Sequence, residues 1–293
     1  MTLRGAVRGL SGPAGAALAL IAVLLLGYGG ALVWLVSQET RLLFRAPASL
    51  PRERPPLPYE EVPLQAPDGS RHLAWVMPAA GASAAERPWV LFLHGNASTI
   101  AHRFNIDRYR GLRELGLNVL APEYRGFGGL DGVPSERALA EDARTAFSYL
   151  TGARGVPASR VVIYGWSLGS AVAVHLAATE APGAVILEGA PASIAAVGQQ
   201  QYPLFPVRLV MRNPFESIRR IGRVRAPLLF LHSPEDTIVP IAHGRLLYQA
   251  APAPKRFVEV RGGHVRANEV DGEMFFGAIR EFLTECGLLG GAG

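Results

Sequence analysis

One short turn dictates much of the architecture open to this 293-residue chain: Gly165-Trp166-Ser167-Leu168-Gly169. It follows the β-branched run 160–164, which is typical of a buried strand, and opens the small apolar run 168–178, which is typical of a buried helix. A serine in so tight a strand-to-helix turn is exposed above the sheet edge, and the glycines leave room for neighbouring segments. The pattern predicts a nucleophilic serine at Ser167; a serine that only caps the helix is the alternative.

Strands and helices alternate from Trp89 onward, and this order predicts an α/β fold with a mostly parallel central sheet of about eight strands and helices on both faces. Ahead of it, residues 61–65 and 72–76 read as a hairpin closed at Pro67-Asp68-Gly69. The expected domain covers residues 61–286, and 287–293 form a flexible tail. We expect strands at 89–93, 118–121, 160–164, 184–187, 228–231 and 256–260, and helices at 100–115, 138–150, 168–178, 242–250 and 269–283. Residues 191–225 are predicted to be an irregular, cap-like insertion over the carboxyl edge of the sheet.

An uncharged apolar segment at residues 14–36 is long enough to cross a bilayer as one helix, and it predicts a single-pass membrane anchor. A cleavable signal peptide is the alternative, but its apolar region is usually shorter, about 7–15 residues. A short basic N-terminus, 1–13, precedes the segment, and the linker 37–60 is rich in proline and expected to be extended. Arginines flank the segment on both sides, so the sequence leaves open which side of the membrane carries the domain. The oligomeric state is also left open.

Composition excludes several other classes of protein. The formal charge is +5, but the basic residues form no run longer than two, so we expect no nucleic-acid partner. The single cysteine, Cys286, excludes an intramolecular disulfide. No cluster of His, Asp and Glu has metal-ligand spacing, and no nucleotide-binding glycine motif is present, so we expect neither a metal nor a cofactor.

A serine nucleophile needs a base, an acid that orients the base, and donors for an oxyanion. Asp236 follows the strand 228–231 and His264 follows the strand 256–260, in the chain order serine, acid, histidine. The carboxyl ends of such strands meet at one sheet edge, so we expect the three side chains to lie together. Glu235 and Glu188 are alternative acids. The backbone N–H groups of Asn96 and Leu168 are the expected oxyanion donors, while His94 and His232 are expected to be structural.

Several further pieces of the chain resemble the α/β-hydrolase family, in particular its membrane-anchored branch related to the yeast bud-emergence hydrolases. They are His94-Gly95-Asn96-Ala97, Tyr124-Arg125-Gly126-Phe127-Gly128, Pro134-Ser135-Glu136, the Ser167 turn, Asp236-Thr237-Ile238-Val239-Pro240 and Gly262-Gly263-His264. The resemblance covers roughly residues 40–285 and implies Ser167 as nucleophile, His264 as base and Asp236 as orienting acid. The chain departs from the family at Glu123, at Gly129-Leu130-Asp131 and at Val265-Arg266, outside the predicted triad.

The predicted function is that of a serine hydrolase which cleaves carboxylic esters or thioesters through an acyl-enzyme. Placement beside a bilayer suggests a small-molecule or lipid ester as substrate, with Trp166, Tyr202 and Phe205 lining the pocket; a core role for Trp166 is equally compatible with the sequence. One alternative is a serine peptidase acting on short peptides. The other is a non-catalytic, membrane-tethered interaction module.

Overall fold

The computed structural model describes residues 12–51, 55–66, 68–81 and 86–290, in two compact units that divide after Leu42. Arg4 and Arg8 of the predicted basic N-terminus, Pro67 of the predicted hairpin turn and the last three residues of the predicted tail lie outside these ranges.

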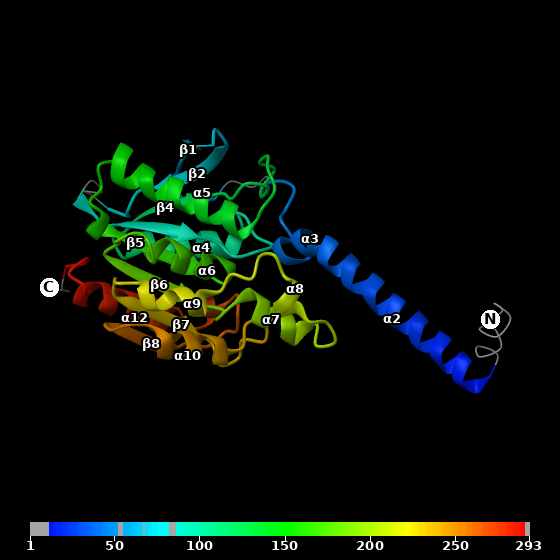
Figure 1. Ribbon diagram of the computed structural model, residues 1–293. Helices are drawn as coiled ribbons and strands as arrows, with labels where there is room; N and C mark the ends of the chain where they lie inside the picture. Colours follow the sequence, from blue (N-terminus) through cyan, green and yellow to red (C-terminus); the bar gives the residue numbers. More distant parts are fainter. Residues whose placement is uncertain (1–11, 52–54, 67, 82–85, 291–293) are drawn as a thin grey trace. The chain divides into compact units, whose positions relative to one another are not determined.

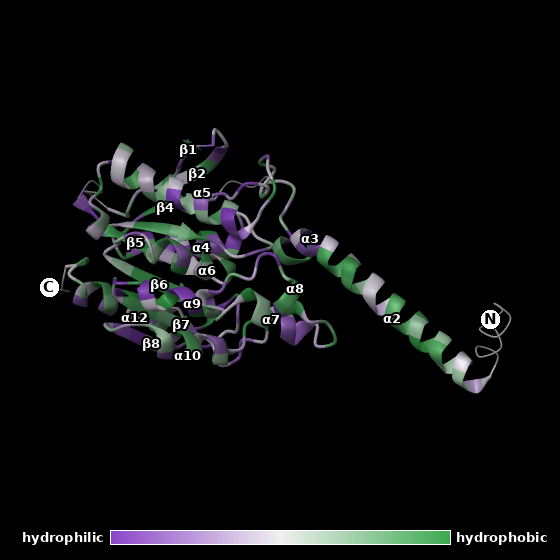
Figure 2. Ribbon diagram, viewed as in Figure 1, coloured by the Kyte–Doolittle hydropathy of each residue, from purple (hydrophilic) through white to green (hydrophobic). Residues whose placement is uncertain are grey.

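The first unit is dominated by helix α2, Pro13–Ser37, which is followed by the short helix α3, Glu39–Phe44, whose last two residues belong to the second unit. Apolar residues extend along the whole of α2 (Figure 2). Its most apolar 18-residue window has a mean hydropathy of 2.3, and none of that window is buried. By length and composition α2 can cross a membrane, in agreement with the predicted segment 14–36; a signal sequence shares these features.

The second unit is built on one eight-stranded sheet in the order β1-β2-β4-β3-β5-β6-β7-β8 (Figure 1). Strand β2 runs antiparallel to both of its neighbours, β1 and β4, and every other pair of neighbouring strands is parallel, so the sheet is mostly parallel, as predicted. The strands are β1 Glu60–Gln65, β2 Arg71–Met77, β3 Trp89–Leu93, β4 Asn118–Pro122, β5 Val161–Trp166, β6 Ala184–Glu188, β7 Leu228–His232 and β8 Lys255–Glu259.

Helices cover both faces of this sheet because the central strands are apolar on both sides. Alternate residues of β3 and β5 enter two separate cores: Leu91 and Ile163 in one, Phe92 and Tyr164 in the other. The first core is closed by α5 Glu136–Ser148, α6 Leu168–Ala177 and α10 Ile241–Ala250, and the second by α4 Arg103–Glu114 and α12 Gly272–Glu285.

The segment 191–225 was expected to be irregular, and this prediction is wrong. It forms three short helices, α7 Ile194–Gln201, α8 Val207–Val210 and α9 Ser217–Arg220, and a 3₁₀ turn at Ile221–Arg223. Helix α9 packs against α6 and α10, and Phe215 and Ile221 are buried, so this end of the segment belongs to the layer on the sheet. Each helix is too short to show a 3.6-residue apolar period, which is why the pattern missed them.

Two further helices differ from their expected bounds. The one expected from Ile100 begins at Arg103, because the N–H of Ile100 donates to the Glu123 carboxylate instead of entering a helix. The one expected at 269–283 is two helices, α11 Ala267–Val270 and α12. Asp271 separates them with a non-helical backbone, and its carboxylate accepts the N–H of Arg261.

Candidate active site

Ser167 lies in the turn between β5 and α6 with φ 55° and ψ −119°, a backbone conformation that costs energy for any residue with a side chain. The neighbouring glycines make this turn possible. A Cβ on Gly165 would collide with the backbone of Gly169 and Ser170, and one on Gly169 would collide with the carbonyl of Leu93. The serine side chain therefore stands at the carboxyl end of β5, as the sequence predicts.

The other two predicted triad residues lie beside it. His264 Nε2 is 2.8 Å from Ser167 Oγ, and His264 Nδ1 is 2.6 Å from Asp236 Oδ2. The three side chains come from the loops after β5, β7 and β8, whose carboxyl ends meet at one edge of the sheet. Their hydrogen bonds connect a hydroxyl, an imidazole and a carboxylate in the order that nucleophilic catalysis requires.

The Asp236 carboxylate is held as an anion. Burial raises its pKa, but hydrogen bonds from the His232 and His264 rings and from the N–H of Val239 outweigh burial, and the pKa lies well below its usual range. Its second oxygen accepts the N–H groups of Ile238 and Val239 at 2.9 and 2.8 Å. A carboxylate that stays ionised can hold a protonated imidazole in place beside the serine.

His232, predicted to be structural, also contacts this carboxylate. Its Nε2 lies 2.8 Å from the carbonyl oxygen of Val239 and 3.5 Å from Asp236 Oδ2. The ring therefore packs inside the loop that carries Asp236 and holds that loop closed.

The predicted oxyanion donors lie on the loop after β3 and at the start of α6. A Cβ on Gly95 would lie 3.3 Å from Ser167 Cβ, so the backbone just before Asn96 passes directly beside the serine. Leu168, the first residue of α6, follows the serine directly. Leu168 therefore lies at a helix N-terminus, where negative charge is favoured, and Asn96 lies on the loop that passes beside the serine; the oxyanion role of these two N–H groups stays a prediction.

His94 is structural, as predicted. Its ring is fully buried, with Nδ1 2.8 Å from the carbonyl oxygen of Gly95 and Nε2 2.8 Å from the Glu123 carboxylate. Glu123 also accepts the N–H of Ile100, so one carboxylate fixes both ends of the loop that contains Asn96.

The three residues predicted to line the pocket differ in their surroundings. Trp166 is 3% exposed, and its Nε1–H donates to the carbonyl oxygen of His264 at 3.1 Å. Tyr202 and Phe205 lie between α7 and α8, and Tyr202 is 39% exposed. A substrate-lining role for these three residues stays a prediction.

The alternative acids have other partners. Glu188 is buried and accepts hydrogen bonds from Arg108 and from the Tyr164 hydroxyl, while Glu235 accepts the N–H of Gly262. The sequence analysis did not identify Arg108, which is fully buried in α4, as part of this region. A signal for it was present, because Arg108 lies four residues after Phe104 and four before Leu112, within the apolar stripe of a helix.

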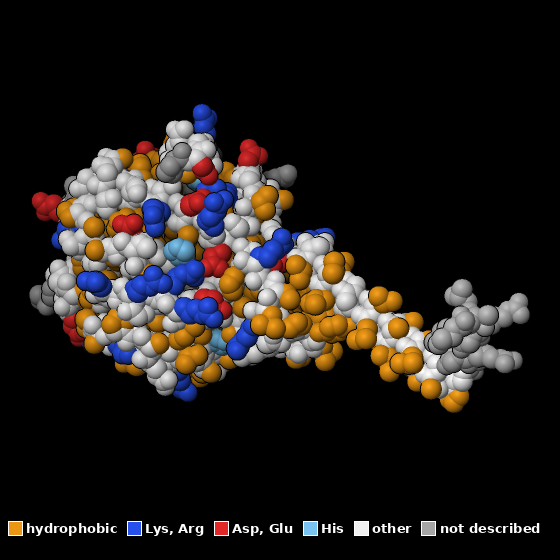
Figure 3. All heavy atoms as spheres, in the orientation of Figure 1, with side chains coloured by type: hydrophobic (Ala, Val, Ile, Leu, Met, Phe, Trp, Pro, Cys, Tyr) orange, Lys and Arg blue, Asp and Glu red, His pale blue; other side chains and the backbone are white. Residues whose placement is uncertain are grey.

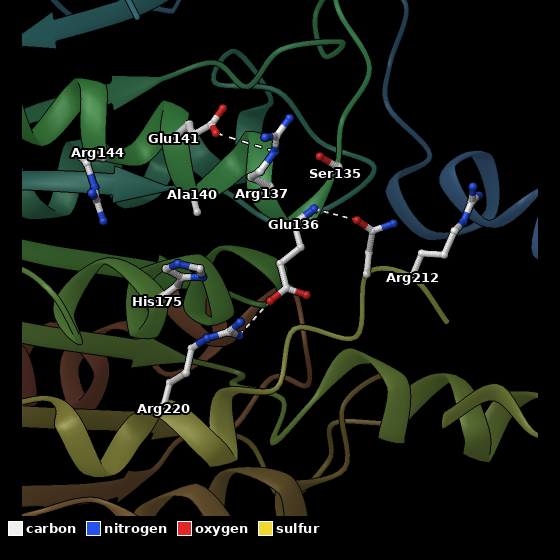
Figure 4. Close-up of a pocket in the computed structure, with 10 residues that line it drawn as sticks. Ser135, Glu136, Arg137, Ala140, Glu141, Arg144, His175, Arg212 and Arg220 are labelled. Atoms are coloured by element: carbon white, nitrogen blue, oxygen red, sulfur yellow. Dashed lines mark hydrogen bonds and ion pairs between the residues drawn. The ribbon is translucent and has the colours of Figure 1, made fainter. Parts of the chain in front are cut away.

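Within the described residues, no group of three or more His, Cys, Asp or Glu side chains is arranged to hold a metal ion. A separate open hollow of about 450 Å³ lies between α5, α6 and the segment before α9 (Figure 4). Its lining is rich in arginine, and basic side chains are scattered over the same face (Figure 3). The arginines that Figure 4 draws with dashed lines, Arg137 and Arg220, pair with Glu141 and Glu136. None of the residues lining this hollow belongs to the Ser167 site.

Comparisons with known proteins agree with this geometry. Residues 90–263 match the alpha/beta hydrolase family. An uncharacterized protein of Mycobacterium tuberculosis is 39% identical over 277 residues, which are 94% of this chain and 97% of the relative. Protein bem46 of Schizosaccharomyces pombe is 30% identical over 272 residues, 87% of this chain and 89% of the relative.

Two proteins with named activities are also similar to the chain. A lysophosphatidylserine lipase of Rattus norvegicus is 33% identical over 197 residues, which are 60% of this chain and 48% of the lipase. The solved structure of a Pyrococcus furiosus esterase superposes with a TM-score of 0.67 and 19% identity, over 82% of this chain and 96% of the esterase, and so shows the fold alone. The chain belongs to the α/β-hydrolase family, in the branch related to the bud-emergence hydrolases.

Proposed function

We propose that this protein is a serine hydrolase that cleaves carboxylic esters or thioesters through an acyl-enzyme at Ser167. The observation that supports this proposal most is the unbroken hydrogen-bond chain from Ser167 Oγ through His264 to Asp236. The strained backbone of Ser167 supports the proposal further, because residues with such unfavourable backbone angles cluster at active sites.

Each group has a role in the proposed reaction. His264 Nε2 takes the proton of Ser167 as Oγ attacks the carbonyl carbon, and the imidazolium then gives that proton to the leaving alcohol or thiol. The N–H groups of Asn96 and Leu168 stabilise the negative oxygen of the tetrahedral intermediate. In the second half, His264 takes a proton from water as the water oxygen attacks the acyl carbon; the imidazolium then returns that proton to Ser167 Oγ as the bond to the serine breaks and the acid leaves. Asp236 keeps the imidazole in the correct tautomer throughout.

The proposed substrates are esters or thioesters with an apolar acyl group, including lipid esters at a membrane surface. Two observations support this class: one relative is named as a lysophosphatidylserine lipase, and α2 is long and apolar enough to hold the protein at a bilayer. We further propose that α2 is retained as a single-pass anchor.

Labelling with a fluorophosphonate, followed by hydrolysis of p-nitrophenyl esters of graded chain length, tests the proposal. The full-length protein should be labelled on serine, and Ser167→Ala should lose both labelling and at least about 10⁴-fold in kcat, because without the nucleophile no acyl-enzyme forms. The chain-length optimum measures the depth of the acyl site.

Outcomes of three kinds would contradict this proposal. A folded parent protein that neither labels nor hydrolyses any ester would favour a non-catalytic module. Faster cleavage of a peptide anilide than of every ester, thioester and lysophospholipid tried would favour a peptidase. Labelling that persists in Ser167→Ala would assign the nucleophile to another residue.

A further inference from the structure

A fully buried arginine, Arg108, lies beside the segments that carry the proposed triad. Arg108 of α4 is fully buried and donates through Nε and Nη2 to the two carboxylate oxygens of Glu188, at 2.8 and 2.5 Å. The Tyr164 hydroxyl donates to the same carboxylate at 2.5 Å. Glu188 ends β6, the strand beside β5, and its carbonyl oxygen accepts the N–H of Ser167 at 2.9 Å. The ion pair is therefore attached to the backbone of the serine turn.

The same guanidinium reaches the loop that carries His264. Nη2 of Arg108 donates to the carbonyl oxygen of Val265 at 3.1 Å, and its Cζ lies 4.7 Å from the ring centre of Trp166. Trp166 in turn donates its indole N–H to the carbonyl oxygen of His264 at 3.1 Å. Two successive carbonyl groups of the histidine loop are thus held by two side chains that stack on each other.

We propose that Arg108 and Trp166 are positioning residues that fix His264 against Ser167. The inference deepens the proposed function and depends on it. The position of an imidazole relative to a hydroxyl decides how fast a proton is transferred, and a misplacement of about 1 Å can cost about 100-fold in rate. Arg108 contacts the backbone carbonyl of Val265, so this contact does not depend on the identity of the side chain at position 265.

Trp166→Phe gives the sharpest test, because it keeps an aromatic ring at this position and removes the N–H donor; it also removes part of the buried indole, a loss of volume that the Trp75→Phe control shares. We expect kcat for a p-nitrophenyl ester and the rate constant of fluorophosphonate labelling to fall together, by about 10- to 100-fold, while KM stays within about twofold. A residue that lined the substrate pocket would change KM instead.

Arg108→Lys keeps the positive charge but cannot hold Glu188 and Val265 at once. We expect a loss of similar size, and the double variant should lose less than the product of the two single losses, because both side chains act on one loop. If Arg108→Lys does not fold, the labelling rate and kcat of Trp166→Phe alone test the positioning role.

Trp75→Phe is the matched control. Trp75 is also 3% exposed, but its Nε1 has no hydrogen-bond partner among the described residues, and it stacks on Tyr59 far along the sheet in β2. Its labelling rate should equal that of the parent. The inference would be overturned if Trp166→Phe were labelled as fast as the parent, or if Trp75→Phe were slowed as much as Trp166→Phe. In either case a parent protein that labels would leave the proposed function standing. A folded parent that does not label would instead end both.

Discussion

The fold lowers the pKa of two buried histidines, His72 and His243. They are 3% and 6% exposed, and burial is the main reason why their pKa values lie below the ordinary value. His232 and Arg208 lower the pKa of His243 further, whereas Asp236 raises it. For His72, Asp142 opposes the effect of burial and Arg125 adds to it. The folded protein therefore binds protons at these two rings less readily than the unfolded chain does.

The free energy of unfolding should consequently fall as the pH is lowered from about 6.5, where histidines of the unfolded chain begin to take up protons. The loss continues until the pH reaches the lowered pKa of the folded protein, and each ring contributes at most about 1.4 kcal/mol per pH unit. Above about pH 7 these two rings contribute no slope. Urea unfolding at several pH values between 8 and 5 measures the effect.

His243→Gln removes one of the rings whose pKa the fold lowers. Its unfolding free energy should depend less steeply on pH between 6.5 and 5.5, by up to about 1.4 kcal/mol per unit, with little change in slope above pH 7. A slope identical to that of the parent would show that His243 does not titrate differently in the folded and unfolded states.

At the scale of single residues, the sequence predicted the residues that belong to catalytic motifs, but not the buried residues that hold them in place. Ser167, Asp236 and His264 stand in a recognisable order along the chain, and the structure brings their side chains within hydrogen-bond distance of one another. Arg108 and Glu188 carry no motif and are 80 residues apart, so only the packing of α4 against the end of β6 reveals that they pair. Contacts of this kind depend on three-dimensional packing, which local sequence patterns do not encode.

In the serine turn, Gly169 is required because α6 begins very close to the end of β3. In Gly169→Ala the new Cβ meets the carbonyl of Leu93 and must push β3 away from α6. We expect a loss of about 1–3 kcal/mol in unfolding free energy and slower fluorophosphonate labelling, because the turn carries both Ser167 and Leu168. Denaturant unfolding and labelling kinetics measure the two effects.

Gly277→Ala is the matched control, since Gly277 is also inside a helix, α12, but a Cβ there would meet nothing within 4 Å. Alanine favours the helix over glycine, so this variant should be up to about 1 kcal/mol more stable and label at the parent rate. If both variants were more stable than the parent and labelled at its rate, the close approach to β3 would not be the reason for the glycine at 169.

The strands were predicted to within two residues at each end, because their apolar runs are continuous and bounded by turn residues. The predicted hairpin at the start of the domain was also confirmed: β1 and β2 pair antiparallel and form one edge of the sheet. Two predicted helix boundaries were wrong, and at each of them a single contact from outside the helix decides where the helix begins or ends. Glu123 diverts Ile100 from α4, and Asp271, bonded to Arg261, divides what reads as a single helix. Neither partner is close enough in sequence to be read from a local pattern.

At the scale of the whole molecule, the second unit begins at Leu43, and its first two residues support the loop that carries Asn96, a proposed oxyanion donor. The carbonyl oxygen of Leu43 accepts the side-chain N–H of Asn96 at 2.9 Å, and that of Phe44 accepts the N–H of Ala97 at 3.0 Å. The Phe44 ring is fully buried against Phe127 and Phe215. The loop with the proposed oxyanion donor therefore rests on the residues that directly follow the first unit.

Two truncations separate anchoring from this support. A chain that starts at Leu43 should no longer sediment with membranes, because α2 is gone, but should keep the unfolding midpoint and labelling rate of the detergent-solubilised parent. A chain that starts at Ala46 also lacks Leu43 and Phe44, so it should lose about 3–5 kcal/mol in unfolding free energy, the usual cost of removing a buried phenylalanine side chain. Its labelling should slow as well, because Asn96 and Ala97 lose their acceptors.

Equal stability and labelling in the two truncated chains would show that residues 43 and 44 only connect the two units. Continued sedimentation of the chain from Leu43 with vesicles would place membrane binding in the second unit as well as in α2.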